Sequence, residues 1–261
     1  MLVQPFTGRT THRRSYRIVK KILLVLQCYH GDKAIAMELA KLIADLEPEV
    51  NQHADFMLVF RHDTEIDHVT ARYVARKFTA VHTFKNIRQT DGWPQACNDL
   101  FFESYVHFCL KVKKGEWDYE AALFFESDCV PLARDWIRQL YEEWHAQRKL
   151  ILGYIYGAGE HPYPHVNGNL LISPQFYLKN PQFYGCSGVK GWDCAHAKTM
   201  LRQATESRLI YNDYARQGIT ADELFAPKHR PKLGTITPVL YHGVKGRCAL
   251  NHVKKKFQME S

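Results

Sequence analysis

The feature that most constrains the fold is an alternation, over the first 148 residues, of apolar runs and segments with helical apolar spacing. A continuous apolar run such as 21–28 is typical of a strand buried on both faces of a parallel sheet. The expected strands lie at 21–28, 55–60, 79–84 and 120–125, and the expected helices at 34–46, 66–78, 95–113 and 133–148. This order predicts an α/β fold with a mostly parallel, doubly wound sheet and right-handed crossovers.

The second half of the chain has a less regular pattern. It predicts strands at 150–155, 169–173 and 235–241, a helix at 195–207 and a short helix from Asp213, with loops at 156–168 and 174–186. Pro238 lies in the last expected strand, which indicates a position at a sheet edge. The 261 residues fit one large α/β domain, which we place at 19–250.

Charge is distributed unevenly along the chain. The formal net charge is +8, with +6 in residues 1–31, −5 in 32–226 and +7 in 227–261. We therefore expect a basic N-terminal arm (1–18) and a basic C-terminal tail (251–261). Basic flanks favour a polyanionic partner, either nucleic acid or an anionic membrane surface. The alternative is that they serve solubility or bind phosphates of a small ligand.

The cysteines and the hydropathy of the chain indicate the cellular compartment in which the protein is expected. The seven cysteines are scattered, and no two have CxxC spacing. Cys28, Cys109 and Cys129 lie in apolar runs and are predicted to be small buried side chains. A reducing, cytoplasmic location is expected. The apolar run 22–26 is far shorter than the roughly 20 residues that cross a bilayer, so no transmembrane segment is predicted.

Two acids follow the expected strand 120–125. Glu126 and Asp128 flank Ser127 at the carboxyl end of this strand, where open parallel sheets bind their ligands. Carboxylate oxygens suit Mg²⁺ and Mn²⁺, which bridge phosphates. The pair thus indicates a metal–diphosphate site. The alternative is a strand end with two solvated acids.

The segment Glu126-Ser127-Asp128, with Cys-Val-Pro-Leu after it, resembles the DxD motif of GT-A glycosyltransferases in its ExD form. The resemblance implies a GT-A-like fold and a nucleotide-sugar donor. It implies that Asp128 binds Mn²⁺ or Mg²⁺ directly, while Glu126 contacts the donor ribose or the metal through water. Ser127 would lie in the donor site between them. Residues 19–132 would then be the nucleotide-sugar-binding half and 133–250 the acceptor half.

A second segment, 241–246 (YHGVKG), is similar to the His-x-Gly-x-x-Lys element of some GT-A enzymes. Its spacing differs, because His242 and Gly243 are adjacent and Lys245 follows His242 by three residues. The resemblance implies that His242 completes the metal site. Gly243 and Lys245 would then bind the donor diphosphate, and the alternative is a surface turn.

Three further residues are expected at the donor from the places that they take in the GT-A pattern. Asp32 and Asp63 follow the first two expected strands, where a carboxylate could accept hydrogen bonds from a base or a ribose. Helix capping by Asp32 and turn formation by Asp63 are equally consistent with these positions. Asn98 lies near the start of the helix that precedes the metal-binding strand and could reach the nucleotide.

The acceptor is expected beside residues 157–169 and 184–196. His165, Asn167 and Gly168 belong to an element similar to the His-x-Asn-Gly of GT-A proteins and, with Trp192, are expected to contact the acceptor. Asp193, next to Trp192, lies where inverting members place a carboxylate base. Asp193 could instead cap a helix that begins near Ala195.

Together these features predict a metal-dependent transfer of a sugar, from a UDP-sugar in our expectation, to an acceptor hydroxyl. The basic arms favour DNA as the partner, with a hydroxymethylated base as acceptor, as in bacteriophage glucosyltransferases. A lipopolysaccharide or other glycan acceptor is the alternative within this class. A metal-dependent nucleotidyl- or phosphotransferase, and a non-catalytic nucleic-acid-binding protein, are the alternatives outside it.

Overall fold

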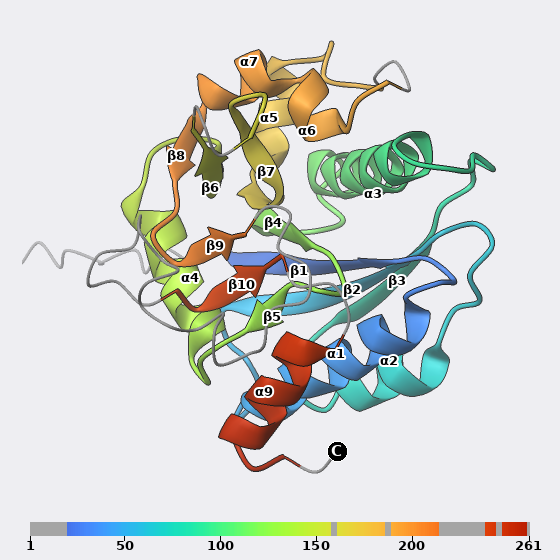
Figure 1. The fold of residues 1–261 in the computed structure, drawn as a ribbon, viewed down its shortest axis with the longest axis vertical. Coiled ribbons are helices and arrows are strands. Elements are labelled where there is room, and N and C mark those ends of the chain that lie inside the picture. Colours follow the sequence, from blue (N-terminus) through green and yellow to red (C-terminus); the bar gives the residue numbers. More distant parts are fainter. Residues whose placement is uncertain (1–19, 158–160, 186–188, 214–237, 244–246, 260–261) are drawn as a thin grey trace, which may run out of the picture.

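The computed structural model describes residues 20–157, 161–185, 189–213, 238–243 and 247–259. Within them the chain forms a seven-stranded sheet with helices on both faces and a small three-stranded sheet beside it (Figure 1). The strand order is β3-β2-β1-β4-β7-β6-β8 in the large sheet and β5-β10-β9 in the small one. The predicted fold class, a mostly parallel sheet flanked by helices, is confirmed.

The first four strands are parallel and adjacent, as the alternating pattern predicts. Strands and connecting helices are β1 (Lys21–Cys28), α1 (Lys33–Leu46), β2 (Ala54–Phe60), α2 (His68–Val74), β3 (Val81–Lys85), α3 (Gln95–Lys113) and β4 (Tyr119–Phe125). β1 lies between β2 and β4, and Leu26 pairs with Phe125. The carboxyl ends of β1 and β4 therefore meet at one edge of the sheet, where parallel folds bind ligands.

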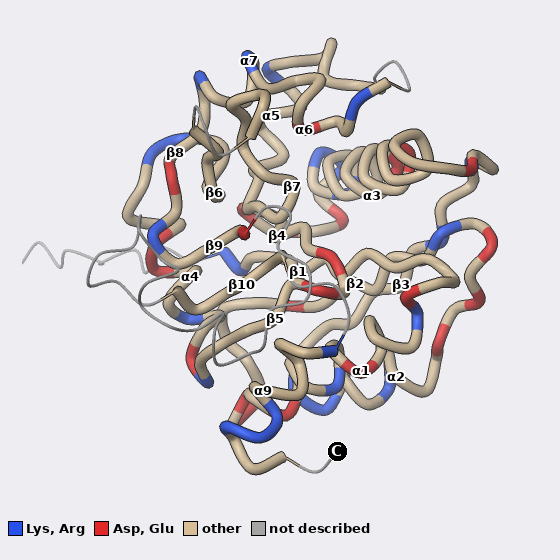
Figure 2. Tube along the Cα trace, viewed as in Figure 1, with Lys and Arg blue, Asp and Glu red and all other residues tan. Residues whose placement is uncertain are grey.

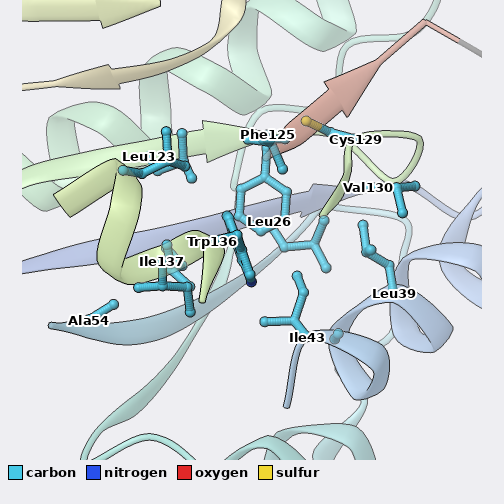
Figure 3. Packing of buried hydrophobic residues seen from close by; sticks show 14 of the residues in the cluster. Leu26, Leu39, Ile43, Ala54, Leu123, Phe125, Cys129, Val130, Trp136 and Ile137 are labelled. Atoms are coloured by element: carbon cyan, nitrogen blue, oxygen red, sulfur yellow. The ribbon is translucent and has the colours of Figure 1, made fainter. Parts of the chain in front are cut away.

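Apolar layers cover both faces of the large sheet. On one face, α1, α2, α4 (Trp136–Ala146) and α9 (Cys248–Lys256) pack on the strands, and α3 packs on the other (Figure 1). Figure 3 shows Trp136 of α4 and Ile43 of α1 beside Leu26 and Phe125. Burial of each such side chain contributes about 1.5–3 kcal/mol, so the strand ends that carry the site are held rigidly.

The second half extends the sheet with shorter elements. β6 (Ile151–Tyr156), β7 (His165–Ile172) and β8 (Ala204–Glu206) follow β4, and β7 is antiparallel to both β4 and β6. The loop predicted at 156–168 is too long, because β7 begins at His165. The loop predicted at 174–186 contains a helix, α5 (Pro174–Lys179), capped by the Ser173 hydroxyl.

The helix predicted at 195–207 is interrupted at His196 and is wrong beyond Leu201. This segment holds the end of α6 (Trp192–Ala195), then α7 (Ala197–Leu201) and strand β8. The amides of Leu150 and Ile151 both donate to the carbonyl of Gln203, and β8 pairs with β6. Sheet pairing over a long sequence separation outweighs the local helical spacing here.

The small sheet joins the two halves of the chain. It consists of β5 (Val130–Pro131), β9 (Ile210–Asn212) and β10 (Leu240–His242). β10 is its central strand, so the predicted edge position is wrong. Pro238 lies before the strand begins, and its missing N–H therefore interrupts no ladder. The short helix predicted from Asp213 to Arg216 lies, after Asp213 itself, in 214–237, outside the described residues.

The predicted basic tail is in part a helix. The boundary at residue 250 falls inside α9, whose Leu250 and Val253 are buried against the domain. Figure 2 shows the basic residues of α9 in blue, of which Lys254 contacts Glu38 of α1 and Lys256 donates to the carbonyl of Leu132. The N-terminal arm (1–18) lies outside the described residues.

Two remaining expectations concern cysteines and membranes. The six described cysteines form no disulfide, and Cys28, Cys109 and Cys129 are buried, as predicted. Among the helices that the structure describes, none combines the length and the apolar character needed to cross a membrane.

Candidate active site

Three potential metal ligands converge beyond the carboxyl end of β4. Glu126 and Asp128 follow β4 directly, and the chain then enters β5. Because β10 runs antiparallel to β5 with Tyr241 opposite Val130, the next residue, His242, comes beside the loop that carries Asp128. His242 Nε2 lies 3.2 Å from Asp128 Oδ1 and 3.5 Å from Glu126 Oε2. One ligand atom of each residue lies within 4.8 Å of the others.

The two carboxylates have different surroundings. The Asp128 side chain is 5% exposed, whereas that of Glu126 is 51% exposed. A buried carboxylate needs a compensating positive charge. Burial by itself would lower the pKa of His242, but the carboxylates of Asp128 and Glu126 outweigh that effect and raise it to about 9. In the protein without a cation, a protonated His242 therefore balances the acids, and a divalent ion can take the place of that proton.

His242 is oriented by residues on the neighbouring strand. Its Nδ1 lies 2.6 Å from Asn212 Oδ1 on β9, so Nδ1 donates there and Nε2 points toward the carboxylates. Metal-binding histidines are commonly held through their second nitrogen in this way. Gly243 has φ +129°, and a Cβ there would lie 2.1 Å from the carbonyl oxygen of Asp213. Only glycine fits this position. Lys245 lies outside the described residues.

Hydrogen bonds fix the loop that carries the two acids. The amide of Glu126 donates to Asn169 Oδ1 of β7 at 2.9 Å, and the Ser127 hydroxyl donates to Asp32 Oδ2 at 2.7 Å. Asp32 occupies the N-cap position of α1, but its side chain makes no capping bond. Its other oxygen accepts from the Tyr29 amide. The capping alternative is therefore wrong, and Asp32 belongs to the wall of the site.

The carboxyl group of Asp63 is engaged within its own turn. It binds the Arg61 guanidinium and lies 2.8 Å from His30 Nδ1. These contacts hold the pKa of Asp63 well below its usual range, with the Arg61 hydrogen bond as the largest cause. His30 links Asp63 to the turn 29–32 after β1. Asp63 thus flanks the site through His30, without a contact to Glu126 or Asp128 among the described interactions.

Asn98 has a different role from the predicted one. It is 0% exposed, its Nδ2 donates to the carbonyl of Lys190 at 3.0 Å, and its Oδ1 accepts from the Trp192 amide at 2.7 Å. A fully buried amide engaged in this way does not reach a nucleotide. The structure instead shows that Asn98 fastens α3 to the segment that leads into α6.

Trp192 is also a packing residue. Its ring stacks on Phe101 of α3 with centroids 3.4 Å apart and an interplanar angle of 3°, and the residue is 7% exposed. The predicted contact with an acceptor is therefore not supported. The stacking does place the next residue, Asp193, at the surface of this core.

Asp193, His165 and Gly168 are brought together on the predicted acceptor side. Asp193 Oδ2 lies 3.7 Å from His165 Nε2. A Cβ on Gly168 would lie 3.2 Å from the Trp192 ring and 3.7 Å from Asp193 Oδ2, so glycine lets β7 approach α6. The N-cap of α6 is Gly191, which excludes the predicted capping role of Asp193. Asn167 turns inward, and its Oδ1 accepts from the amide and the side chain of Asn169.

The acceptor side and the acid pair share one electrostatic site. Burial raises the pKa of Asp193, His165 opposes this, and Glu126 is close enough to raise it further. Burial lowers the pKa of His165, which favours the neutral imidazole. A carboxyl group that is harder to ionise than usual, beside a cluster of potential metal ligands, has the character of a proton acceptor at a reaction site.

Two positioning residues were missed by the sequence reasoning. Asn169 holds the Glu126 amide, and Asn212 orients His242. Asn169 is the last residue of the His-Val-Asn-Gly-Asn element. The resemblance therefore indicated this segment, but it predicted a role for Asn167 and not for Asn169. Asn212 belongs to no motif, and only the pairing of β9 with β10 places it beside His242.

Comparison with known proteins identifies the fold. No family model matches the chain, and no curated protein matches it in sequence. Among solved structures, the glycosyltransferase GlyE of Streptococcus pneumoniae is similar with a TM-score of 0.54 at 11% identity, covering 93% of this chain and 61% of GlyE. Mouse xyloside xylosyltransferase 1 gives 0.52 at 13% identity, covering 86% of this chain and 98% of that one.

The chain has the GT-A fold. A third similar structure, the bifunctional glycosyltransferase WbbM, gives a TM-score of 0.53 at 9% identity and covers 85% of this chain. The chain spans about three fifths of the length of GlyE and 45% of that of WbbM. At these identities the likeness establishes the arrangement of the elements, and the chemistry has to be argued from the site.

Proposed function

We propose that this protein is a metal-dependent glycosyltransferase that moves a sugar from a nucleotide-sugar, in our expectation a UDP-sugar, to an acceptor hydroxyl. The observation that carries the proposal is the convergence of Glu126, Asp128 and His242 where β4 ends in a GT-A fold. In open parallel sheets this edge is where ligands bind.

The donor set fits Mn²⁺, or Mg²⁺ with more water ligands. Two carboxylates supply the oxygen ligands that these cations prefer, and Asn212 orients the imidazole of His242 toward the same point. A bound cation would neutralise charge that develops on the leaving nucleoside diphosphate. Asp128, which is buried, holds the fixed position, and the half-exposed Glu126 has room to meet the donor ribose or a water.

Asp193 is the proposed base of the transfer. In an inverting reaction the acceptor oxygen bonds to the anomeric carbon, the bond from that carbon to the diphosphate breaks, and the acceptor proton goes to Asp193. The raised pKa of this partly buried carboxyl group suits it for taking the proton. The Cys194 amide donates to Asp193 Oδ1 at 2.8 Å, so Oδ2 is the oxygen that we assign to the acceptor.

The acceptor itself is a separate question, for which a hydroxymethylated base in DNA remains our prediction. The described part of the basic tail adds no support, since Lys254 and Lys256 have partners within the domain. DNA affinity measured against salt concentration tests the prediction. A steep loss of affinity with salt would support DNA, and a slope near zero would favour a glycan acceptor.

Asp128→Ala tests the catalytic assignment. We expect UDP-sugar turnover in the presence of Mn²⁺ to fall below detection, because the buried ligand is lost. The matched control is Asp118→Ala, since Asp118 lies just before the other end of β4 and is 70% exposed in an ion pair with Lys20. The control should keep its turnover. Unchanged turnover in Asp128→Ala would refute the site, and turnover of nucleoside triphosphates instead would favour a nucleotidyltransferase.

A further inference from the structure

A second cluster of possible metal ligands lies beside the acceptor wall. It consists of His161, His165 and Cys194, and one ligand atom of each lies within 4.8 Å of the others. His165 is the first residue of β7, His161 precedes it, and Cys194 belongs to α6. The cluster therefore joins two segments that are about thirty residues apart in the sequence. Neither the proposed donor site nor the proposed base explains why two histidines and a cysteine meet here.

The protein core fixes this juxtaposition. Trp192, two residues before Cys194, stacks on Phe101, and its amide is held by Asn98. Gly168 allows β7 to approach the same tryptophan closely. α6 thus sits against β7 for reasons of packing, and Cys194 faces the histidines on a rigid support. Ligand sites are better defined on such elements than on free loops.

Both imidazoles contact the backbone of Tyr163. The Nδ1 of His165 lies 2.6 Å from the Tyr163 carbonyl oxygen, and donation there leaves its Nε2 with a lone pair, the usual state of a metal-binding histidine. The Nδ1 of His161 lies 3.0 Å from the same oxygen and accepts from the Tyr163 amide at 3.1 Å in the other tautomer, so the Tyr163 backbone holds this ring in either state. The two rings meet edge to face, with centroids 4.5 Å apart.

We propose that His161, His165 and Cys194 bind a transition-metal ion of the Zn²⁺ type, at a site separate from that of the donor cation. Two imidazoles and a thiolate suit zinc, whereas the two carboxylates of the donor site suit Mn²⁺ or Mg²⁺. Zinc bonds of about 2.0–2.3 Å put tetrahedral ligand atoms roughly 3.4–3.8 Å apart, so ligand atoms that lie within 4.8 Å of one another need only a small side-chain movement to bind the ion. The thiol proton leaves to solvent as the thiolate binds.

This ion has a structural consequence for the acceptor side. It joins the segment 161–165 to α6, and α6 carries Asp193. The Asp193 carboxylate lies 3.7 Å from His165 Nε2, beyond hydrogen-bond distance, at the edge of the cluster. A water completes the fourth position. The inference does not depend on the proposed sugar transfer, because ion binding is measured without any substrate.

Cobalt binding to the full chain, stripped of metal with a chelator, tests the proposal. We expect one Co²⁺ to give a sulfur-to-cobalt charge-transfer band in the near ultraviolet, which Zn²⁺ abolishes by displacement and Mn²⁺ at the same concentration does not. Cys194→Ser should lose the band, and His161→Gln should weaken cobalt binding at least about 10-fold. Cys97→Ser, which alters an exposed cysteine, is the matched control and should keep the band.

The outcomes separate this site from the donor site. Asp128→Ala should keep the band, because its carboxylate belongs to the other cluster. Absence of the band in the unaltered protein, or its persistence in Cys194→Ser, would overturn the proposal. Circular dichroism checks that each variant is folded. Should Cys194→Ser fail to fold, unchanged cobalt affinity in the partly exposed His161→Gln would overturn it equally.

Discussion

The nucleotide-sugar-binding half and the acceptor half of this chain are built in different ways. In residues 19–132, four parallel strands lie side by side, three of them (β1, β2 and β4) mostly buried, and a helix connects each strand to the next in the sequence. In residues 133–250, strands β6, β7 and β8 extend that sheet in mixed directions, and β9 and β10 form a second sheet with β5. The first half supplies the two acids, and the second half supplies His242 and Asp193.

The difference teaches how each half gains its stability. Buried parallel strands gain most of their stability from apolar burial, and the apolar runs that are buried can be recognised in the local sequence. The acceptor half depends on contacts between distant residues, such as Trp192 on Phe101 and the Glu143 carboxylate with the Ser207 hydroxyl and the Arg208 amide. If this is correct, substitutions in the two halves should differ in whether they affect catalysis, metal binding or folding.

The largest effect is expected from Asp193→Asn, in the acceptor half. Loss of a general base lowers the rate of the transfer step by about 100- to 10,000-fold. Donor binding and Mn²⁺ affinity should not change, because the ligands of the first half remain. Steady-state kinetics with a donor and an acceptor, together with a Mn²⁺ titration, measures both. Asp135→Asn, at the N-cap of α4, is the control, and equal rates in the two variants would remove Asp193 from the chemistry.

Gly243→Ala is expected to destabilise the connection between the halves. A Cβ would clash with the Asp213 carbonyl at 2.1 Å on a backbone with φ +129°. We expect a loss of about 3 kcal/mol in the free energy of unfolding, measured with urea. The control Gly115→Ala also has positive φ, +72°, but meets nothing within 4 Å and should lose only about 1 kcal/mol. Equal losses would show that the clash is relieved by a small shift.

The sequence predicts the first half well because its signals are local. The strands β1 to β4 lie within two residues of their expected bounds. The Glu126–Asp128 segment could be placed at a sheet edge for the same reason. The joining of His242 to these acids was predicted only through a resemblance, since it depends on the β5–β10 register, which the local pattern does not record.

The second half was predicted less well for a physical reason. Segment 195–207 has helical spacing, yet pairing with β6 makes its end a strand. Asn98 and Trp192 were expected to meet ligands, because polar and aromatic residues near a site resemble binding residues in sequence. Only the packing of α3 on α6 shows that both are buried and fasten the acceptor wall.

Asn169→Ala tests whether the acceptor half positions the metal ligands of the first half. Its side chain holds the Glu126 amide, and loss of such an outer contact weakens metal binding by about 10- to 100-fold. Calorimetric titration with Mn²⁺ measures the change. Asn180→Ala is the control, because Asn180 is also a buried asparagine with side-chain bonds, to Phe176 and Gln203. Equal Mn²⁺ affinity in both variants would mean that Glu126 needs no support from β7.

The smallest effect is expected from Ser127→Ala, and it has a counterpart in the other half. The Ser127 hydroxyl donates to Asp32, and the Ser207 hydroxyl donates to Glu143. Burial raises the pKa of both carboxyl groups. Each substitution should lower the free energy of unfolding by about 1–2 kcal/mol, because a partly buried acceptor loses its donor.

Only Ser127→Ala should also raise the donor KM, by a few fold, since the Ser127–Asp32 bond fixes the loop between the two proposed metal ligands. Ser207 and Glu143 lie in the acceptor half, away from that loop, and Ser207→Ala should therefore leave the donor KM unchanged. Equilibrium unfolding and donor-dependent kinetics on both variants make the comparison. A similar rise in KM for both variants would show that donor affinity follows general stability. The two halves would then not differ in their effect on donor binding.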